Sequence, residues 1–383
     1  MGIWLARVLA AILLLALGSG HEVHTSCEPD AGNEAAEVFR DWHGVTAFAV
    51  LEQLAEGREQ AAVAFMRWAR ERGFNVVRVF TMAPRLLGLS AADGVAAVPR
   101  LLRLAADLDL TVELVAFADT RSLDLDLEAH VDGIARAIAG AKNVVVELAN
   151  ENDHRTQDPR LTDPARLQAL RKRLPADVPV SLGSLHGGDM RVGRYGGGDY
   201  VTIHLPRSLP PWDHVGATAR LADLARQAGK PVVSDEPIGA GERVERRRRW
   251  TNPAVFFGLG LMGRMSGVPA TFHCEDCLYA KVPGPTQQAC ATAFIEGARL
   301  LPEGRRFSLV PVSGMLRQAT LPGVTAIHAA EDETGEWTVV AALGAPPRLV
   351  LPWAEGWTGK VIARKGRVTV FRAVRAPSPA RGR

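Results

Sequence analysis

The stretch Val144-Val-Val-Glu-Leu-Ala-Asn-Glu-Asn152 is a short apolar run that ends in polar residues. A run of this kind is typical of a strand that is buried on both faces of a parallel sheet. A second stretch, Pro231-Val-Val-Ser-Asp-Glu-Pro237, has the same form. Each stretch therefore predicts a buried strand whose carboxyl end carries an acidic side chain.

Similar short runs recur along the chain from about residue 42 to residue 301, and amphipathic segments separate them. Alternating strands and helices favour parallel pairing through right-handed crossovers. Eight repeats match a closed (β/α)8 barrel in size, although the glycine-rich segment 186–199 is too poor in apolar residues for a full helix. An open doubly wound sheet is the alternative, but no GxGxxG follows the first strand. The predicted strands are 44–50, 75–81, 111–118, 143–149, 178–184, 200–205, 231–235 and 268–272.

The barrel is expected to span 38–302, and the segments on either side of it differ in pattern. Residues 1–25 hold one basic residue and then an apolar run, which predicts an export signal and a secreted or periplasmic protein. An uncleaved membrane anchor is the alternative, and no later segment is long enough to span a bilayer. Short alternating runs predict a small β-sandwich-like domain over 303–376, with strands that include 348–351, and a disordered tail over 377–383.

The composition is that of an ordinary globular protein, with 383 residues, 47% hydrophobic and 23% charged. The net charge of +3 and the lack of a basic stripe argue against a nucleic-acid partner. The even number of cysteines, Cys27, Cys274, Cys277 and Cys290, permits disulfides in an exported chain, and a loop disulfide is either Cys274–Cys277 or Cys277–Cys290. A structural zinc site usually needs a second ligand pair, which is not found here.

Polar residues at the ends of the predicted strands point to the reaction, because active sites of such barrels lie at the carboxyl ends of the strands. Glu151 and Glu236 are two carboxylic acids on one rim, as cleavage of a glycosidic bond requires. One protonates the leaving oxygen while the other attacks or stabilises the anomeric carbon. For retention of configuration we expect the two carboxyl groups to lie about 5–5.5 Å apart, with the charge of one raising the pKa of the other.

Three stretches resemble signatures of the clan of (β/α)8 retaining glycosidases that includes cellulases, mannanases and β-galactosidases. They are 39–48 on the first strand, 147–152 on the fourth strand and 233–239 on the seventh strand. The resemblance implies that Glu151 is the acid/base and Glu236 the nucleophile of a two-step double displacement. It also implies that Arg78 lies beside the nucleophile and that Asn150 contacts the sugar 2-hydroxyl. Neither a metal nor an organic cofactor is implied.

The chain also departs from that pattern. The clan often has a tyrosine on strand six, where this sequence has His204, and it usually has a tryptophan at the end of strand eight, where Phe272 and His273 stand. Trp212 and Trp250 lie on predicted rim loops. The candidate substrate-binding residues are therefore Arg78, Asn150, His204, Trp212 and His273.

The remaining polar residues near the rim have structural interpretations. Glu147 is expected to be a buried partner of Arg78, since an unpaired arginine inside a barrel is very costly. Asp235 is expected to point away from its neighbour Glu236 by strand alternation. Glu113 stays unassigned, and His186 is a weaker site candidate. Arg246–Arg249 is interpreted as a solvated helix face, with binding of acidic sugars as the alternative.

Three other functions remain open. A non-catalytic carbohydrate-binding barrel would keep the rim residues without turnover. A metal-dependent hydrolase would use His273, Cys274 and Cys277 together with His204. A transglycosidase would use the same two glutamates with a sugar acceptor. The expected partner is an oligosaccharide, a polysaccharide or a glycoside, and the identity of the sugar is not encoded in any motif of the sequence.

Overall fold

The computed structural model describes residues 38–121, 123–186, 196–206, 208–240, 250–274 and 283–376. The predicted export signal at 1–25, the run Arg246–Arg249 and the tail 377–383 lie outside these residues, as do Cys27 and Cys277. Within the described ranges, no helix combines the length and the hydropathy that crossing a membrane requires.

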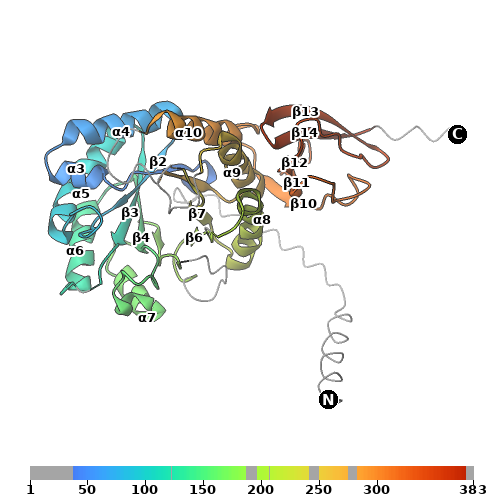
Figure 1. Ribbon diagram of the computed structural model, residues 1–383. Helices are drawn as coiled ribbons and strands as arrows, with labels where there is room; N and C mark the ends of the chain where they lie inside the picture. Colours follow the sequence, from blue (N-terminus) through green and yellow to red (C-terminus); the bar gives the residue numbers. More distant parts are fainter. Residues whose placement is uncertain are drawn as a thin grey trace, which may run out of the picture. The chain divides into compact units, whose positions relative to one another are not determined.

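Eight parallel strands form the predicted barrel (Figure 1), and they follow one another around it in chain order. This order confirms the (β/α)8 fold and excludes the doubly wound alternative. The short strand β8 (Gly239–Ala240) also pairs with β9. The barrel strands are β1 (His43–Thr46), β2 (Val76–Phe80), β3 (Thr111–Phe117), β4 (Val144–Ala149), β5 (Val180–Ser181), β6 (Val201–His204), β7 (Val232–Glu236) and β9 (Ala270–Cys274).

No backbone ladder pairs β5 with β6 among the described residues, and hydrogen bonds of Asp199 and of two hydroxyls join them instead. The backbone N–H of Asp199 donates to the carbonyl oxygen of Val180 at 2.7 Å, and the Asp199 carboxylate accepts from Val180 N at 3.0 Å. Inside the barrel, the hydroxyls of Ser181 and Thr202 lie 3.0 Å apart. No helix occurs between β5 and β6 among the described residues, in line with the glycine-rich connection.

Helices cover the outside of the barrel, and local sequence sets where several of them begin and end. Asn252 accepts a hydrogen bond from the first turn of α9, which Pro253 opens. Gly73 and Gly229 end two helices in the left-handed conformation, which glycine adopts without strain. The helices are α3 (Val50–Ala55), α4 (Glu59–Arg72), α5 (Ala91–Asp107), α6 (Leu127–Ile138), α7 (Pro164–Arg171), α8 (Pro211–Ala228), α9 (Pro253–Ser266) and α10 (Pro285–Ala298), with a 3₁₀ turn at Pro159–Thr162.

A five-stranded antiparallel sheet follows the barrel in the chain. Alternate residues of β12 divide between two clusters: Val339 joins the core that includes the barrel helices, and Val340 joins a second cluster with Leu349. The strand predicted at 348–351 is wrong, because this segment covers the second cluster without pairing. The fold class is confirmed, while the domain limits 38–302 and 303–376 stay predictions. The strands are β10 (Phe307–Val310), β11 (Ala326–Asp332), β12 (Thr338–Leu343), β13 (Trp357–Lys365) and β14 (Val368–Arg375).

The helices α9 and α10 precede and follow β9 in the chain. Two glycines allow them to pack backbone against backbone. A Cβ atom added to Gly260 would lie 2.0 Å from the carbonyl oxygen of Phe294. A Cβ atom added to Gly297 would lie 2.0 Å from the carbonyl oxygen of Phe257. Because both obstacles are backbone atoms, a side chain at either position requires the helices to move apart.

We therefore expect Gly260→Ala and Gly297→Ala each to lower the free energy of unfolding by about 1–3 kcal/mol, despite the better helix propensity of alanine. Gly216→Ala in α8 is the matched control, because its nearest obstacle lies at an ordinary contact distance of 3.6 Å. That control should be neutral or stabilising by up to about 1 kcal/mol. Urea denaturation of the three variants measures the difference, and equal midpoints would contradict the close approach of the helices.

Candidate active site

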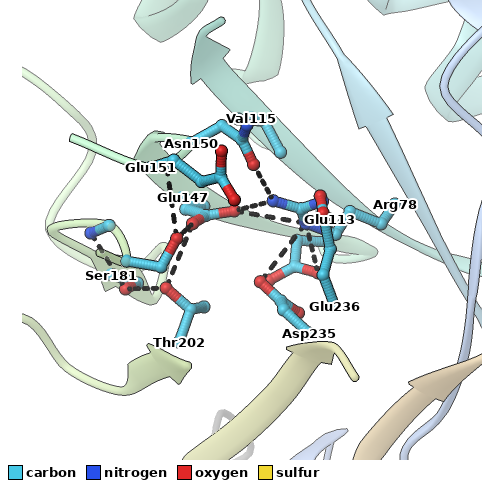
Figure 2. A network of polar contacts seen from close by, with 12 residues as sticks. Arg78, Glu113, Val115, Glu147, Asn150, Glu151, Ser181, Thr202, Asp235 and Glu236 are labelled. Carbon is cyan, nitrogen blue, oxygen red and sulfur yellow. Dashed lines mark hydrogen bonds and ion pairs between the residues drawn. The ribbon is translucent and has the colours of Figure 1, made fainter. Parts of the chain in front are cut away.

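A fully buried guanidinium lies at the centre of the polar interior of the barrel (Figure 2). Arg78 on β2 donates from Nη1 to Oε1 of Glu236 at 2.6 Å. Its Nη2 donates to Oε2 of Glu147 at 2.5 Å and to Oδ1 of Asn150 at 2.9 Å. Arg78 thus links strand β4 to strand β7, and it lies beside Glu236 as the sequence resemblance implied.

Asp235 and Glu236 both face Arg78, although they are neighbours on one strand. Asp235 Oδ2 lies 3.2 Å from Arg78 Nε. The pairing of β7 with β6 passes from Ser234 directly to Glu236, so that Asp235 is an extra residue in the strand. A bulge of this kind changes the direction in which side chains point. The prediction that Asp235 points away from Glu236 is therefore wrong.

Glu147 accepts hydrogen bonds from three directions. Besides the guanidinium of Arg78, its Oε1 accepts from the hydroxyl of Thr202 at 3.1 Å and from that of Ser184 at 3.3 Å. Both carboxylate oxygens of Glu147 therefore have hydrogen-bond donors. The predicted role of Glu147 as the buried partner of Arg78 is confirmed.

Glu113 on β3 is a fourth buried carboxyl group of this network. Its Oε1 accepts from the hydroxyl of Tyr200 at 2.9 Å, and its Oε2 lies 3.7 Å from Arg78 Nε. Burial raises the pKa of Glu113 to about 7, against the opposing effect of Arg78. Burial likewise raises the pKa of Asp235 well above its usual value, with the charge of Glu113 adding to it. Sequence reasoning left Glu113 unassigned because it lies in mid-strand, away from any polar strand end.

Glu151 lies in the turn after β4 with a positive φ of 48°, a conformation that few residues other than glycine adopt. Its Oε1 lies 3.3 Å from Nδ1 of His204, and its Oε2 lies 3.0 Å from Nδ1 of His186. Nδ1 of His204 is also 3.8 Å from Oε2 of Glu236. A carboxylate oxygen of Glu151 and one of Glu236 lie within 4.8 Å of each other. The two glutamates therefore share one site.

Glu236 acts on Glu151 in the expected direction, but the expectation of a raised pKa for Glu151 is wrong for the free protein. Burial and Glu236 do raise the pKa of Glu151, but the hydrogen bond and the charge of His204, together with His186, outweigh them and lower it to about 2. The sequence did not reveal this, because the two histidines lie on different segments and only the fold brings them to one carboxylate.

The remaining predicted residues divide between the site and the surrounding core. His273 is buried on β9, and its ring lies 5.9 Å from that of Phe48. Trp212 lies in the first turn of α8, where its ring is beside Gly258 of α9, so the prediction that it lies in a loop is wrong. Trp250 is partly buried against the main core. The roles of these residues toward a sugar stay predictions.

Sequence reasoning also missed the aromatic side chains next to the guanidinium. The rings of Phe48 and Phe80 stack at 4.2 Å, and the Arg78 guanidinium carbon lies 5.5 Å and 5.7 Å from their centroids. His154 was missed as well, and its ring lies 4.6 Å from that of His186. Apolar and aromatic residues are frequent in all the strands, so these positions carried no separate signal.

Three sets of described residues bring metal-ligating atoms within 4.8 Å of one another. Glu151 belongs to two of them, and all three lie within the network described above. The alternative cluster of His273, Cys274 and Cys277 stays a prediction, since Cys277 lies outside the described residues. Cys290 is a free cysteine buried in α10, so the predicted Cys277–Cys290 disulfide is wrong, while Cys274–Cys277 stays a prediction.

No family model matches the chain, and no curated protein matches it in sequence. The fold is similar to that of a proposed glycoside hydrolase from Bacteroides vulgatus, with a TM-score of 0.55 and 14% identity over 85% of this chain and 66% of that protein. This chain thus spans just under two thirds of the length of the Bacteroides protein. It is also similar to a GH5_18 protein from Streptomyces cattleya in complex with GlcNAc, with a TM-score of 0.50 and 14% identity over 69% of this chain and 82% of that protein. At such identities the likeness shows a shared fold.

Replacing Arg78 by methionine should lower the free energy of unfolding by about 3–5 kcal/mol, because it leaves Glu147 and Glu236 as buried carboxylates without their cation. The deficit should shrink at acid pH, where protonation removes the uncompensated charge. Arg173→Met, which breaks a solvent-exposed pair with Asp132, is the control and should change stability little. Chemical denaturation at several pH values measures both, and equal losses would contradict the central role of Arg78.

Replacing His204 by phenylalanine should raise the pKa of Glu151 from about 2, because burial and the charge of Glu236 then act with less opposition. His186→Phe should raise it less, since the effect of His186 is smaller. NMR titration of carboxyl-labelled glutamate follows the change. An unaltered Glu151 pKa in the His204→Phe variant would show that the histidine does not control this carboxylate.

Proposed function

We propose that this protein is a retaining glycoside hydrolase in which Glu236 is the nucleophile and Glu151 the acid/base. The observation that carries the proposal is the approach of their carboxylate oxygens to within 4.8 Å across the mouth of a (β/α)8 barrel. Retaining enzymes hold their two carboxyl groups about 5–5.5 Å apart, whereas inverting enzymes leave more room for a water molecule. The observed approach fits the shorter spacing.

The environment of Glu236 suits attack on an anomeric carbon. Arg78 donates to one carboxylate oxygen at 2.6 Å, which fixes the direction of the side chain. The other oxygen, Oε2, faces Nδ1 of His204 and the side of the site that holds Glu151. In the first step this carboxylate forms an ester bond with the sugar while the glycosidic bond breaks.

The leaving oxygen takes up a proton in the same step. The surroundings of Glu151 indicate which side chains supply this proton. Glu151 is ionised in the free protein, since its pKa is about 2. Nδ1 of His204, 3.3 Å from Oε1 of Glu151, is placed to exchange a proton with this carboxyl group, and we infer that Glu151 passes the proton on to the leaving oxygen. In the second step Glu151 removes a proton from water as the water oxygen attacks the anomeric carbon. The bond from this carbon to Glu236 breaks, and the carboxylate of Glu236 is free again.

A saccharide is the substrate class that this chemistry requires. The Streptomyces cattleya protein of similar fold was solved in complex with GlcNAc, which supports a sugar ligand for this type of barrel. We also propose that the chain is exported, as its first 25 residues predict. An acceptor sugar in place of water would make the same site a transglycosidase.

Turnover of a panel of chromogenic glycosides should fall by orders of magnitude in Glu236→Gln, and by about 10²–10⁴-fold in Glu151→Gln. Glu331→Gln, on β11 of the C-terminal sheet, is the matched control and should be fully active. A 2-fluoro glycoside should label Glu236, as peptide mass spectrometry would show. Normal turnover in either site variant would end the assignment, and sugar binding without any turnover would favour the non-catalytic barrel.

A further inference from the structure

The network around Arg78 contains more negative charge than a buried site tolerates. One guanidinium faces four carboxyl groups, whose side chains are between 0% and 6% exposed. If all four were ionised, one positive charge would stand against four negative charges, a net charge of −3. Uncompensated charge inside a protein is so costly that buried groups take up protons instead.

The hydrogen-bond donors around the four carboxyl groups indicate which of these groups hold a proton. Glu147 and Glu236 each accept from the guanidinium of Arg78. Oε2 of Glu113 and both carboxyl oxygens of Asp235 are buried and accept from no donor. Both of these carboxyl groups also face the same donor atom, Nε of Arg78, at 3.7 Å and 3.2 Å. Two ionised carboxylates beside one cation in a buried site repel each other, so a proton held between them relieves the excess negative charge.

We propose that Asp235 and Glu113 share a proton, and that the neutral Asp235 is a positioning residue for Arg78. The part of this proposal that concerns catalysis rests on the proposed glycosidase function. The part that concerns the proton rests only on the buried network.

The shared proton neutralises Asp235, so that Arg78 stays hydrogen-bonded to Glu236, the proposed nucleophile. Nε of Arg78 lies 3.2 Å from Asp235, while Nη1 holds Glu236 at 2.6 Å. An ionised Asp235 would compete with Glu236 for the same guanidinium. With the proton in place, Glu147 and Glu236 are the anions that the guanidinium holds most closely, and the direction of the nucleophile is fixed.

Charged and titratable groups from each neighbouring strand face this pair. Burial raises the pKa of both members, to about 7 for Glu113, which supports a retained proton at neutral pH. A ring nitrogen of His204 lies within 4.8 Å of a carboxyl oxygen of Asp235. The facing groups are Arg78 on β2, Glu147 on β4, the Tyr200 hydroxyl next to β6, His204 on β6 and Glu236 on β7 itself.

Replacement of Asp235 by asparagine or by leucine tests the positioning role. Asparagine is neutral and keeps a donor, as the protonated acid does, so Asp235→Asn should retain kcat within a few fold. Asp235→Leu has no donor and should lose kcat at least about tenfold, the effect of roughly one lost hydrogen bond, with a smaller change in KM. An ionised Asp235 paired with Arg78 would instead make both variants lose kcat equally, and this outcome would overturn the proposal.

The pH dependence of unfolding tests the proton without any substrate. Because the folded-state pKa values are raised, the stabilisation is complete below the ordinary carboxyl pKa and is lost as the pH rises toward 7. Relative to Asp235→Asn, the unfolding constant of the natural protein should rise about tenfold per pH unit for each shared proton between about pH 5 and pH 7. Glu113→Gln provides a second neutral variant that should behave alike.

The two measurements separate the two proposals. Equal pH slopes for the natural protein and both neutral variants would overturn the shared proton, whatever the activity. A natural protein with the steeper slope that cleaves no glycoside would retain the proton and overturn the proposed function instead.

Discussion

One positive charge, the Arg78 guanidinium, is fully buried inside the barrel and organises the residues around it. A guanidinium without solvent requires anions at hydrogen-bond distance. Arg78 obtains them from β4 and β7, which fixes how these strands are placed relative to β2. The bulge at Asp235 brings a further carboxyl group to Arg78, and the hydroxyls of Thr202 and Ser184 donate to Glu147. The hydrogen bond from Arg78 sets the direction of Glu236, the candidate nucleophile.

The second feature of the site is the pair of histidines that bind Glu151. Where the clan of glycosidases that the sequence resembles often has a tyrosine, this chain has His204, whose Nδ1 lies 3.3 Å from Glu151 and 3.8 Å from Glu236. A histidine can store and release a proton near neutral pH, whereas a tyrosine hydroxyl titrates far above it. The substitution therefore gives the proposed acid a proton source beside it and keeps its carboxylate ionised at rest.

Much of the fold and part of the site could be predicted from the sequence. Apolar runs predicted the buried strands, and polar residues at strand ends predicted the convergence of Arg78, Asn150, Glu151 and Glu236. Side-chain direction could not be predicted where the backbone departs from regular geometry, as at the bulge of Asp235. The role of Glu113 and the low pKa of Glu151 depend on neighbours from distant segments, and no local pattern encodes them.

In the proposed double displacement, Glu236 and Glu151 act on opposite faces of one sugar. Proton NMR of the first sugar released from a cleavable glycoside, recorded before mutarotation, reports whether this happens. The released sugar should first appear with the anomeric configuration of the substrate. Initial release of the opposite anomer would mean a single displacement by water and would rule out the double displacement.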